Sequence, residues 1–141
     1  MTRKEIKEFF AKRDENWQRH DYTALSEDHA ADGIVESPFS GILKGRSAIE
    51  KVYREWFASF PDVKYSTERL LVDGNNAVQF VKMTGVQEGD FCGLTPTGKQ
   101  FDVRCAFFFS FADGKIVREI RVYDLTGVLV QLGVLKAKPS F

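Results

Sequence analysis

One carboxylate in the C-terminal half of the chain stands where it could do chemistry. Asp124 ends the apolar-rich run 116–124, in which a period of two places it on one face with Ile120 and Val122. A carboxylate there either forms a turn at the end of a strand or lies in an apolar pocket. In a pocket, burial would raise its pKa, and it could act as a general acid and base.

A second polar group precedes it. Asp102 and Arg104 are two residues apart in the run 101–111, so they share one face of a strand. They form either a catalytic carboxylate–guanidinium arrangement or a salt-bridged pair on the outer face of a sheet, at a subunit contact. The opposite face is wholly apolar and either lines a cavity or meets helices: it consists of Phe101, Val103, Cys105, Phe107, Phe109 and Phe111.

These residues need a sheet to position them. Asp113-Gly114 lies between the runs 101–111 and 116–124 and predicts a β-hairpin. Two further strands, 63–72 and 77–87, flank a predicted turn, and a Gly-, Pro- and Thr-bearing loop follows at 89–98.

Helices are predicted before the strands. Thr2–Glu5 reads as a capping box for an amphipathic helix that reaches Trp17, in which Arg13 interrupts the apolar stripe. A short helix over 22–29 and a short strand over 34–37 follow. A second capping box, Ser47–Glu50, predicts a strongly amphipathic helix that Pro61 ends. Helices first and antiparallel strands after them indicate an α+β fold.

The composition describes an ordinary soluble domain. We predict a single domain over 1–141, because 141 residues can bury a sufficient core. Twenty basic and twenty acidic residues are intermixed, which disfavours nucleic acid as a partner. No signal peptide or membrane-spanning run is apparent, so we expect a cytoplasmic protein without a membrane partner.

The cysteines and histidines suggest no metal site. Cys92 and Cys105 are interpreted as reduced core residues, and their spacing relative to His20 and His29 fits no metal motif. We interpret His29 as a solvated residue at a helix end, with a catalytic base as the alternative. Apolar residues on both faces of 101–111, where Ala106 and Phe108 oppose the phenylalanine row, predict a homodimer joined through its sheets.

Six short motifs in order resemble the SnoaL-like polyketide cyclases of the ketosteroid isomerase and nuclear transport factor two-like superfamily. They lie at 45–49, 60–62, 85–91, 95–99, 113–116 and 124–133. The resemblance implies a cone-shaped barrel: a strongly curved, mostly antiparallel sheet with three N-terminal helices that enclose a pocket. It also implies a homodimer that needs no cofactor or metal and that binds a hydrophobic, carbonyl-containing small molecule. Its reaction would be an aldol-type cyclisation or an isomerisation.

The resemblance assigns roles to particular residues. Asp124 matches the family's catalytic aspartate. Gln87 stands where many members carry a histidine, and its amide can donate a hydrogen bond to an oxyanion but cannot relay a proton. Arg104 is the third candidate catalytic residue.

Five residues are candidates for substrate contact: Glu36, Tyr53, Trp56, Phe91 and Leu129. Glu36 is alternatively a surface charge, and Tyr53 and Trp56 are alternatively core residues on the apolar stripe of the third helix.

Two other functions fit the same residues. Asp102, Arg104 and Asp124 resemble, with the order of arginine and aspartate reversed, the Asp/Arg/Asp arrangement of limonene epoxide hydrolases, in which carboxylates activate water and protonate the epoxide. The chain could also be a non-catalytic small-molecule-binding dimer module, because a fold alone does not decide function.

Overall fold

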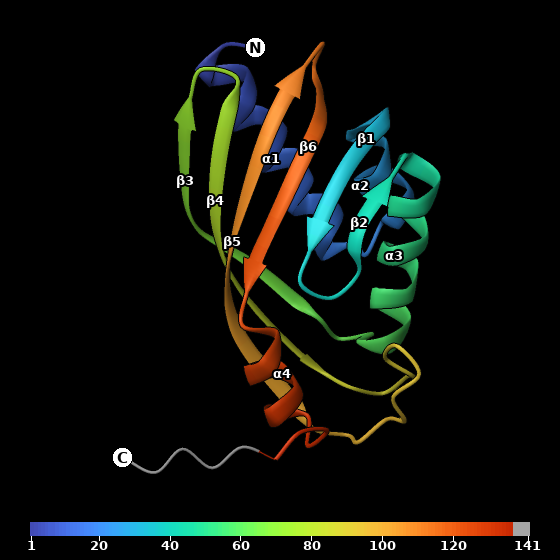
Figure 1. Cartoon of the computed structure of the whole chain (residues 1–141). Coiled ribbons are helices and arrows are strands. Elements are labelled where there is room, and N and C mark those ends of the chain that lie inside the picture. The colour runs from blue at the N-terminus through green and yellow to red at the C-terminus, as the bar shows by residue number, and fades with distance from the viewer. Residues whose placement is uncertain (137–141) are drawn as a thin grey trace.

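The structure is a computed structural model, and it describes residues 1–136. Three N-terminal helices cover one face of a six-stranded sheet, and a fourth helix follows the last strand (Figure 1). The helices are α1 (Arg3–Gln18), α2 (Tyr22–Glu27), α3 (Arg46–Ser59) and α4 (Leu125–Gln131). The strands are β1 (His29–Ser37), β2 (Gly41–Lys44), β3 (Lys64–Asp73), β4 (Asn76–Val86), β5 (Gln100–Ala112) and β6 (Lys115–Tyr123).

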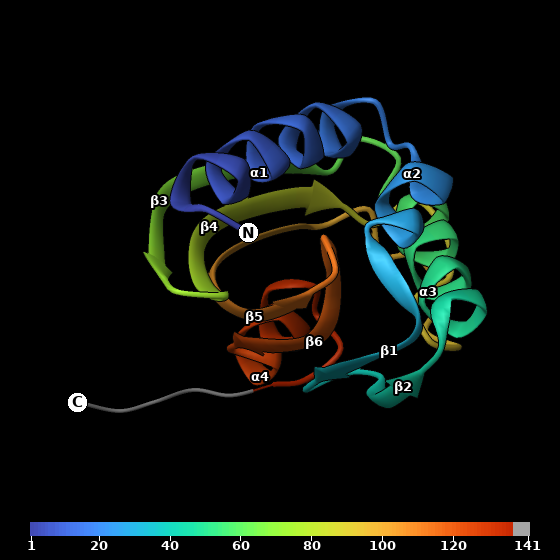
Figure 2. The same ribbon diagram turned by 90° about the horizontal axis from the view of Figure 1, so that it is seen from above.

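The sheet is mixed and strongly curved. Its strand order is β2-β1-β6-β5-β4-β3, and every neighbouring pair is antiparallel except β1 with β6. Figure 2 shows the sheet bending around the helical layer, with α1 next to β3 and α3 next to β1 and β2. The predicted α+β cone with three N-terminal helices is therefore confirmed.

Local signals account for several boundaries. Thr2 and Glu5 form the predicted capping box of α1. Asp113 and Gly114 both have positive φ, at 51° and 73°, and close the hairpin between Ala112 and Lys115. Such a turn matches the twist of the paired strands, which explains the Asp-Gly sequence.

The second predicted capping box is wrong. Helix α3 begins at Arg46, with Gly45 as its N-cap and no side-chain cap. Gly45 has a φ of 90°, and its amide donates to the carbonyl of Gly33 at 2.8 Å. The chain therefore turns into α3 through a conformation that favours glycine, and the turn precedes Ser47.

The phenylalanine row of β5 faces the helices. Phe109 meets Phe10 of α1 with ring centroids 4.9 Å apart, and Phe111 meets Phe9 at 5.1 Å. Both pairs are edge-to-face, an arrangement that adds stability beyond the buried area. The inner face of β5 is thus part of the core, and towards Phe101 it also borders a cavity.

Candidate functional site

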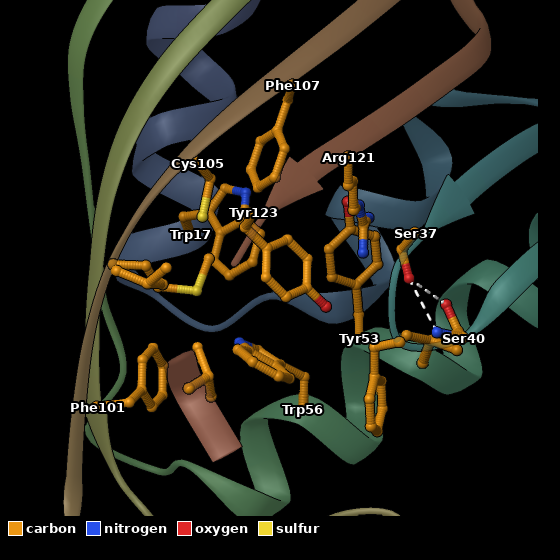
Figure 3. Close-up of a pocket in the computed structure, with 15 residues that line it drawn as sticks. Trp17, Ser37, Ser40, Tyr53, Trp56, Phe101, Cys105, Phe107, Arg121 and Tyr123 are labelled. Carbon is orange, nitrogen blue, oxygen red and sulfur yellow. Dashed lines mark hydrogen bonds between the residues drawn. The ribbon is translucent and has the colours of Figure 1, made fainter. Parts of the chain in front are cut away.

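A cavity lies between the helices and the curved sheet. Figure 3 shows Tyr53 and Arg121 meeting at one end of it, with Phe101 and Cys105 on the opposite side. Its walls are mainly aromatic and aliphatic, as is usual for small-molecule sites. The lining residues are Trp17, Ser37, Phe39, Ser40, Val52, Tyr53, Trp56, Met83, Phe101, Val103, Cys105, Phe107, Arg121, Tyr123 and Val128.

The cavity opens towards a second hollow outside it. Phe39, Ser40, Val52 and Trp56 line both spaces. The inner space available to water-sized molecules is about 50 Å³, and the outer one is about 320 Å³. An enclosed cavity of about 150 Å³ accepts benzene. A ring-bearing ligand therefore fills the inner space only if the shared side chains move aside.

Behind Arg121 and Tyr53, which line the polar end of the cavity, lie charged groups that α1 and β6 bury. Arg13 lies on the core side of α1 and is 2 % exposed, while Glu119 on β6 is 1 % exposed. Arg13 donates to Asp28 at 2.9 Å, to the Leu25 carbonyl at 3.2 Å and to Glu119 at 3.4 Å. Arg121, two residues along β6, donates through Nε to Glu119 Oε2.

Electrostatics keep this cluster ionised. Burial on its own would raise the pKa of Glu119, but the charges of Arg121 and Arg13 lower it below its usual value. Burial likewise opposes the charge on Arg121, yet Glu119 and other neighbours raise the pKa of that guanidinium. A carboxylate and two guanidiniums thus share one buried site, because the carboxylate stabilises both cations and they stabilise its negative charge.

His29 lies beside the cluster in its neutral form. It opens β1, is fully buried, and places Nε2 3.9 Å from Glu119 Oε1. Burial lowers the pKa of His29 to about 3, although Glu119 opposes this. The expectation of a solvated histidine at a helix end is wrong, because β1 starts earlier than predicted and pairs with Ile116 of β6.

The remaining polar groups at the cavity are protonated donors at neutral pH. Burial raises the pKa of Tyr123 and of Cys105 to about 12 in each case. The buried indole Nε1 atoms of Trp17 and Trp56 have no hydrogen-bond partner among the described residues. An unpaired buried donor is costly, so these groups favour a ligand that carries acceptor atoms.

The family model for SnoaL-like polyketide cyclases matches residues 8–132. The chain belongs to the SnoaL-like polyketide cyclase family. Solved structures share its fold. AclR from Streptomyces galilaeus, a proposed hydroxylase, is 22 % identical with a TM-score of 0.84, and the alignment covers 98 % of this chain and 91 % of that one.

Two other structures are comparably similar. TsrD from Streptomyces laurentii is 22 % identical with a TM-score of 0.84, over 96 % of this chain and 99 % of that one. IdmH from Streptomyces antibioticus, a proposed polyketide cyclase, is 24 % identical with a TM-score of 0.75, over 91 % and 98 %. A search of curated proteins finds no match. Identities this low show a common fold.

In this SnoaL-like protein Asp124 lies outside the cavity. Its side chain is exposed, and Oδ1 accepts the Gly127 amide at 2.9 Å as the N-cap of α4. A side chain at position 127 would collide with that carboxylate. The prediction that Asp124 occupies an apolar pocket is wrong, and the turn-forming alternative is what the structure shows. Capping α4 brings Val128 to the cavity wall.

We therefore expect substitutions of Asp124 to affect stability only. Asp124→Asn retains an acceptor that caps helices well, so its free energy of unfolding should be unchanged. Asp124→Ala should lose about 1 kcal/mol, the usual cost of removing an N-cap. Urea denaturation and calorimetric titration of an aromatic ketone would measure the two properties. A stable Asp124→Asn protein that no longer binds the ketone would contradict an effect on stability alone.

Gln87 is committed to a loop. It is fully buried, and its Nε2 donates to the carbonyls of Gly89, Leu94 and Thr95 at 3.1–3.3 Å. Its amide thus takes the place of backbone partners that the irregular loop lacks. The prediction that Gln87 donates to an oxyanion is wrong in this structure, because its N–H groups are occupied and it does not line the cavity.

Asp102 and Arg104 lie on the outer face of the sheet. Asp102 is 3.6 Å from Lys82, and Arg104 donates to Glu68 at 2.9 Å. All four side chains are substantially exposed, as expected for the salt-bridge alternative. The prediction that Arg104 is a catalytic residue at the cavity is therefore wrong, and Asp102, Arg104 and Asp124 do not form the alternative epoxide hydrolase site.

The five predicted substrate-contact residues do not all lie at the cavity. Tyr53 and Trp56 line the inner cavity, and Phe91 lines the outer hollow. Glu36 accepts from Arg118 at 2.5 Å outside the cavity, and Leu129 packs against the core without lining either space. The interpretations of Glu36 as a surface charge and of Tyr53 as a core residue both describe what is seen, since Tyr53 serves core and cavity together.

Sequence reasoning missed Glu119 and Arg121 and left Arg13 as a mere interruption. One signal could have found them. An arginine on the apolar stripe of a helix needs a buried anion, and Glu119 shares a strand face with Arg121.

Within residues 1–136 no helix is long and apolar enough to cross a membrane, and no group of His, Cys, Asp and Glu gathers as metal ligands would. Cys92 and Cys105 are free thiols, and Cys92 is exposed where a core position was expected.

Proposed function

We propose that this protein binds a hydrophobic, carbonyl-bearing small molecule in the cavity and catalyses its aldol-type ring closure. The observation that carries the proposal is the apolar cavity with hydrogen-bond donors at one end, where Arg121 and Tyr53 lie. Membership of the SnoaL-like polyketide cyclase family supports the reaction type.

The donors would act on developing negative charge. In the ring closure, the α-carbon of an enolate forms a bond to a second carbonyl carbon, and the oxygen of that carbonyl becomes an alkoxide. Fixed donors in a site that excludes water stabilise such oxyanions strongly. Arg121 is suited to this because its position is already fixed by Glu119 and Tyr53.

The substrate should be an activated carbon acid. None of the residues that line the cavity is a carboxylate or a histidine, so no lining group is a general base for an ordinary ketone. A hydrogen between two carbonyl groups ionises to water far more readily. We therefore propose a β-dicarbonyl substrate whose enolate is selected by the donors and whose second carbonyl lies within reach.

Substitution of Arg121 tests the proposal. Arg121→Lys keeps the charge but loses the fixed fork of donors, so kcat/KM should fall about 100-fold, the scale of one lost oxyanion donor. The measurement is ring closure of an aryl ketone with a β-keto ester side chain, followed by absorbance. Arg104→Lys, on the outer face, is the matched control and should react at the normal rate. Equal rates for the two variants would contradict the role of Arg121.

One observation favours a second function, a non-catalytic binder. The same lack of a lining carboxylate or histidine would suit a protein that only holds its ligand. Saturable binding of the keto ester without ring closure above the uncatalysed rate would establish the binder. Epoxide hydrolysis has no such support, because Asp102 and Arg104 face away from the cavity.

We further propose that the protein is a homodimer joined through the outer face of its sheet. Phe80, Ala106 and Val122 are direct cross-strand partners on β4, β5 and β6 and form an apolar row. Phe80 is 40 % and Val122 59 % exposed on the two sides of Ala106, so the row presents apolar surface to solvent. A second copy related by a two-fold axis would cover this row with the same row.

Light scattering tests the assembly. The wild type should have twice the chain mass of 16.1 kDa at micromolar concentration. Val122→Lys places a charge in the row and should give a monomer, while Ile42→Lys, at an exposed position of β2, should remain a dimer. A wild-type monomer would refute the proposal.

We also propose that the protein is cytoplasmic, because Cys92 and Cys105 are free thiols and the cytosol keeps thiols reduced.

A further inference from the structure

The hydroxyl of Tyr53 has an unusual set of partners. Its oxygen accepts an N–H from Arg121 at 3.0 Å and another from Arg13. A guanidinium group can only donate hydrogen bonds. Neither arginine can therefore accept the hydrogen of Tyr53, and both lone pairs of the phenol oxygen are engaged.

No protein acceptor takes that hydrogen among the described residues. The carboxylate that influences Tyr53 most is Glu119, and its two oxygens accept from Arg13 and from Arg121. Tyr53 is 2 % exposed and lines the cavity. Figure 3 shows its ring rising from α3 along the cavity wall towards Arg121. With arginine N–H groups on two sides of the oxygen and no protein acceptor among the described residues, the O–H remains available to an acceptor in the cavity that Tyr53 lines.

We propose that Tyr53 donates its proton to the oxygen of the bound ligand, with Arg13 and Glu119 as the residues that position it. The inference deepens the proposed function and rests on it for the reaction step. The alkoxide formed by ring closure takes the hydrogen of Tyr53: one O–H bond breaks, another forms, and no electrons are exchanged with an outside reagent. Water returns the proton to Tyr53 when the product leaves.

The surroundings suit both states of the phenol. Burial raises the pKa of Tyr53 above its ordinary value, although Arg13 and Arg121 oppose this, so the hydroxyl is protonated before reaction. After transfer, the phenolate lies between two guanidinium groups, where its charge is balanced at once. Arg13 is buried on α1 and reaches no ligand itself, so it acts through Tyr53.

The test uses two probes of the same shape, 2-acetylnaphthalene and its hydrocarbon isostere 2-isopropenylnaphthalene. Donation by Tyr53 should make the ratio of their calorimetric affinities about tenfold more favourable to the ketone in the wild type than in Tyr53→Phe. The infrared stretch of the ¹³C-labelled carbonyl should lie at lower frequency in the wild type and return in Tyr53→Phe. Equal ratios and equal frequencies in the two proteins, or failure of the ketone to bind the wild type, would overturn the proposal.

Three further variants keep the proposal testable if Tyr53→Phe does not fold. Tyr53→3-fluorotyrosine keeps the shape with a more acidic hydroxyl and should lower the carbonyl frequency further, whereas Tyr123→3-fluorotyrosine should not. An unchanged frequency with the fluorinated Tyr53 would refute donation even if Tyr53→Phe is unfolded. Arg13→Lys should weaken the shift while affinity for the hydrocarbon is retained. All these measurements report binding of the probes and not catalysis. A failure to catalyse ring closure would therefore refute the proposed function, whereas hydrogen-bond donation by Tyr53 would still be tested by the binding data.

Discussion

Acid should destabilise this protein through one buried histidine. The pKa of His29 is about 3 in the folded protein and about 6.5 in an exposed chain, because burial disfavours the imidazolium. Between these values the unfolded state binds a proton that the folded state does not, so stability falls as pH falls. The free energy of unfolding should therefore drop by about 4 kcal/mol between pH 6.5 and pH 3. Each pH unit contributes about 1.4 kcal/mol in the middle of this interval and about half as much at each of its two ends, where one state is half-protonated.

The charges around His29 fix the direction of this effect. Burial, the largest cause, opposes the imidazolium, as do Arg13, Arg121 and Arg46, and together they outweigh Glu119, which favours it. Neither ring nitrogen of His29 has a hydrogen-bond partner among the described residues, so His29→Phe removes no hydrogen bond. In urea denaturation at pH 7 and pH 4, that variant should lose much less stability on acidification than the wild type. Parallel pH profiles for the two proteins would contradict the assignment.

The position of His29 also shows which part of the fold the sequence could not predict. Period and turn chemistry are local, and they identified the helical stripe of α3, the capping box of α1 and the hairpin at Asp113. The start of β1 depends on a parallel pairing with Ile116, far away in the chain, and the register shifts between His29 and Ile34. No short-range pattern encodes such a pairing.

The site was misjudged because the buried face of β6 is its charged face, whereas the apolar face of a strand is usually the buried one. Alternation grouped Asp124 with Val122 on one face, and the apolar character of that face indicated the interior, but β6 ends at Tyr123 and Asp124 is the N-cap of α4. In the structure this face points outward, and the opposite face carries Glu119 and Arg121 inward. Periodicity tells which residues share a face, but which face is buried depends on what the other elements supply. Here α1 supplies Arg13, which makes a charged inner face stable.

The largest effect of a single substitution should come from Glu119. In Glu119→Gln the buried guanidiniums of Arg13 and Arg121 would lose their common anion, and removal of one partner of a buried ion pair typically costs about 3–5 kcal/mol. Arg13 would keep Asp28 at 2.9 Å, whereas Arg121 has no other carboxylate partner within the described residues. Urea denaturation at pH 7 would measure the loss.

Glu68→Gln is the matched control, since Glu68 also pairs with an arginine of the sheet, but on the exposed outer face. An exposed pair contributes at most about 1 kcal/mol. The pKa of Glu119 is lowered in the folded protein, so its contribution is present above its ordinary value of 4.5 and is lost as pH falls through the folded value. The difference in stability between wild type and Glu119→Gln should therefore shrink in acid. Equal losses for the two glutamine variants at pH 7 would mean that Arg13 and Arg121 are stable without the carboxylate, and the polar end of the cavity would then need another explanation.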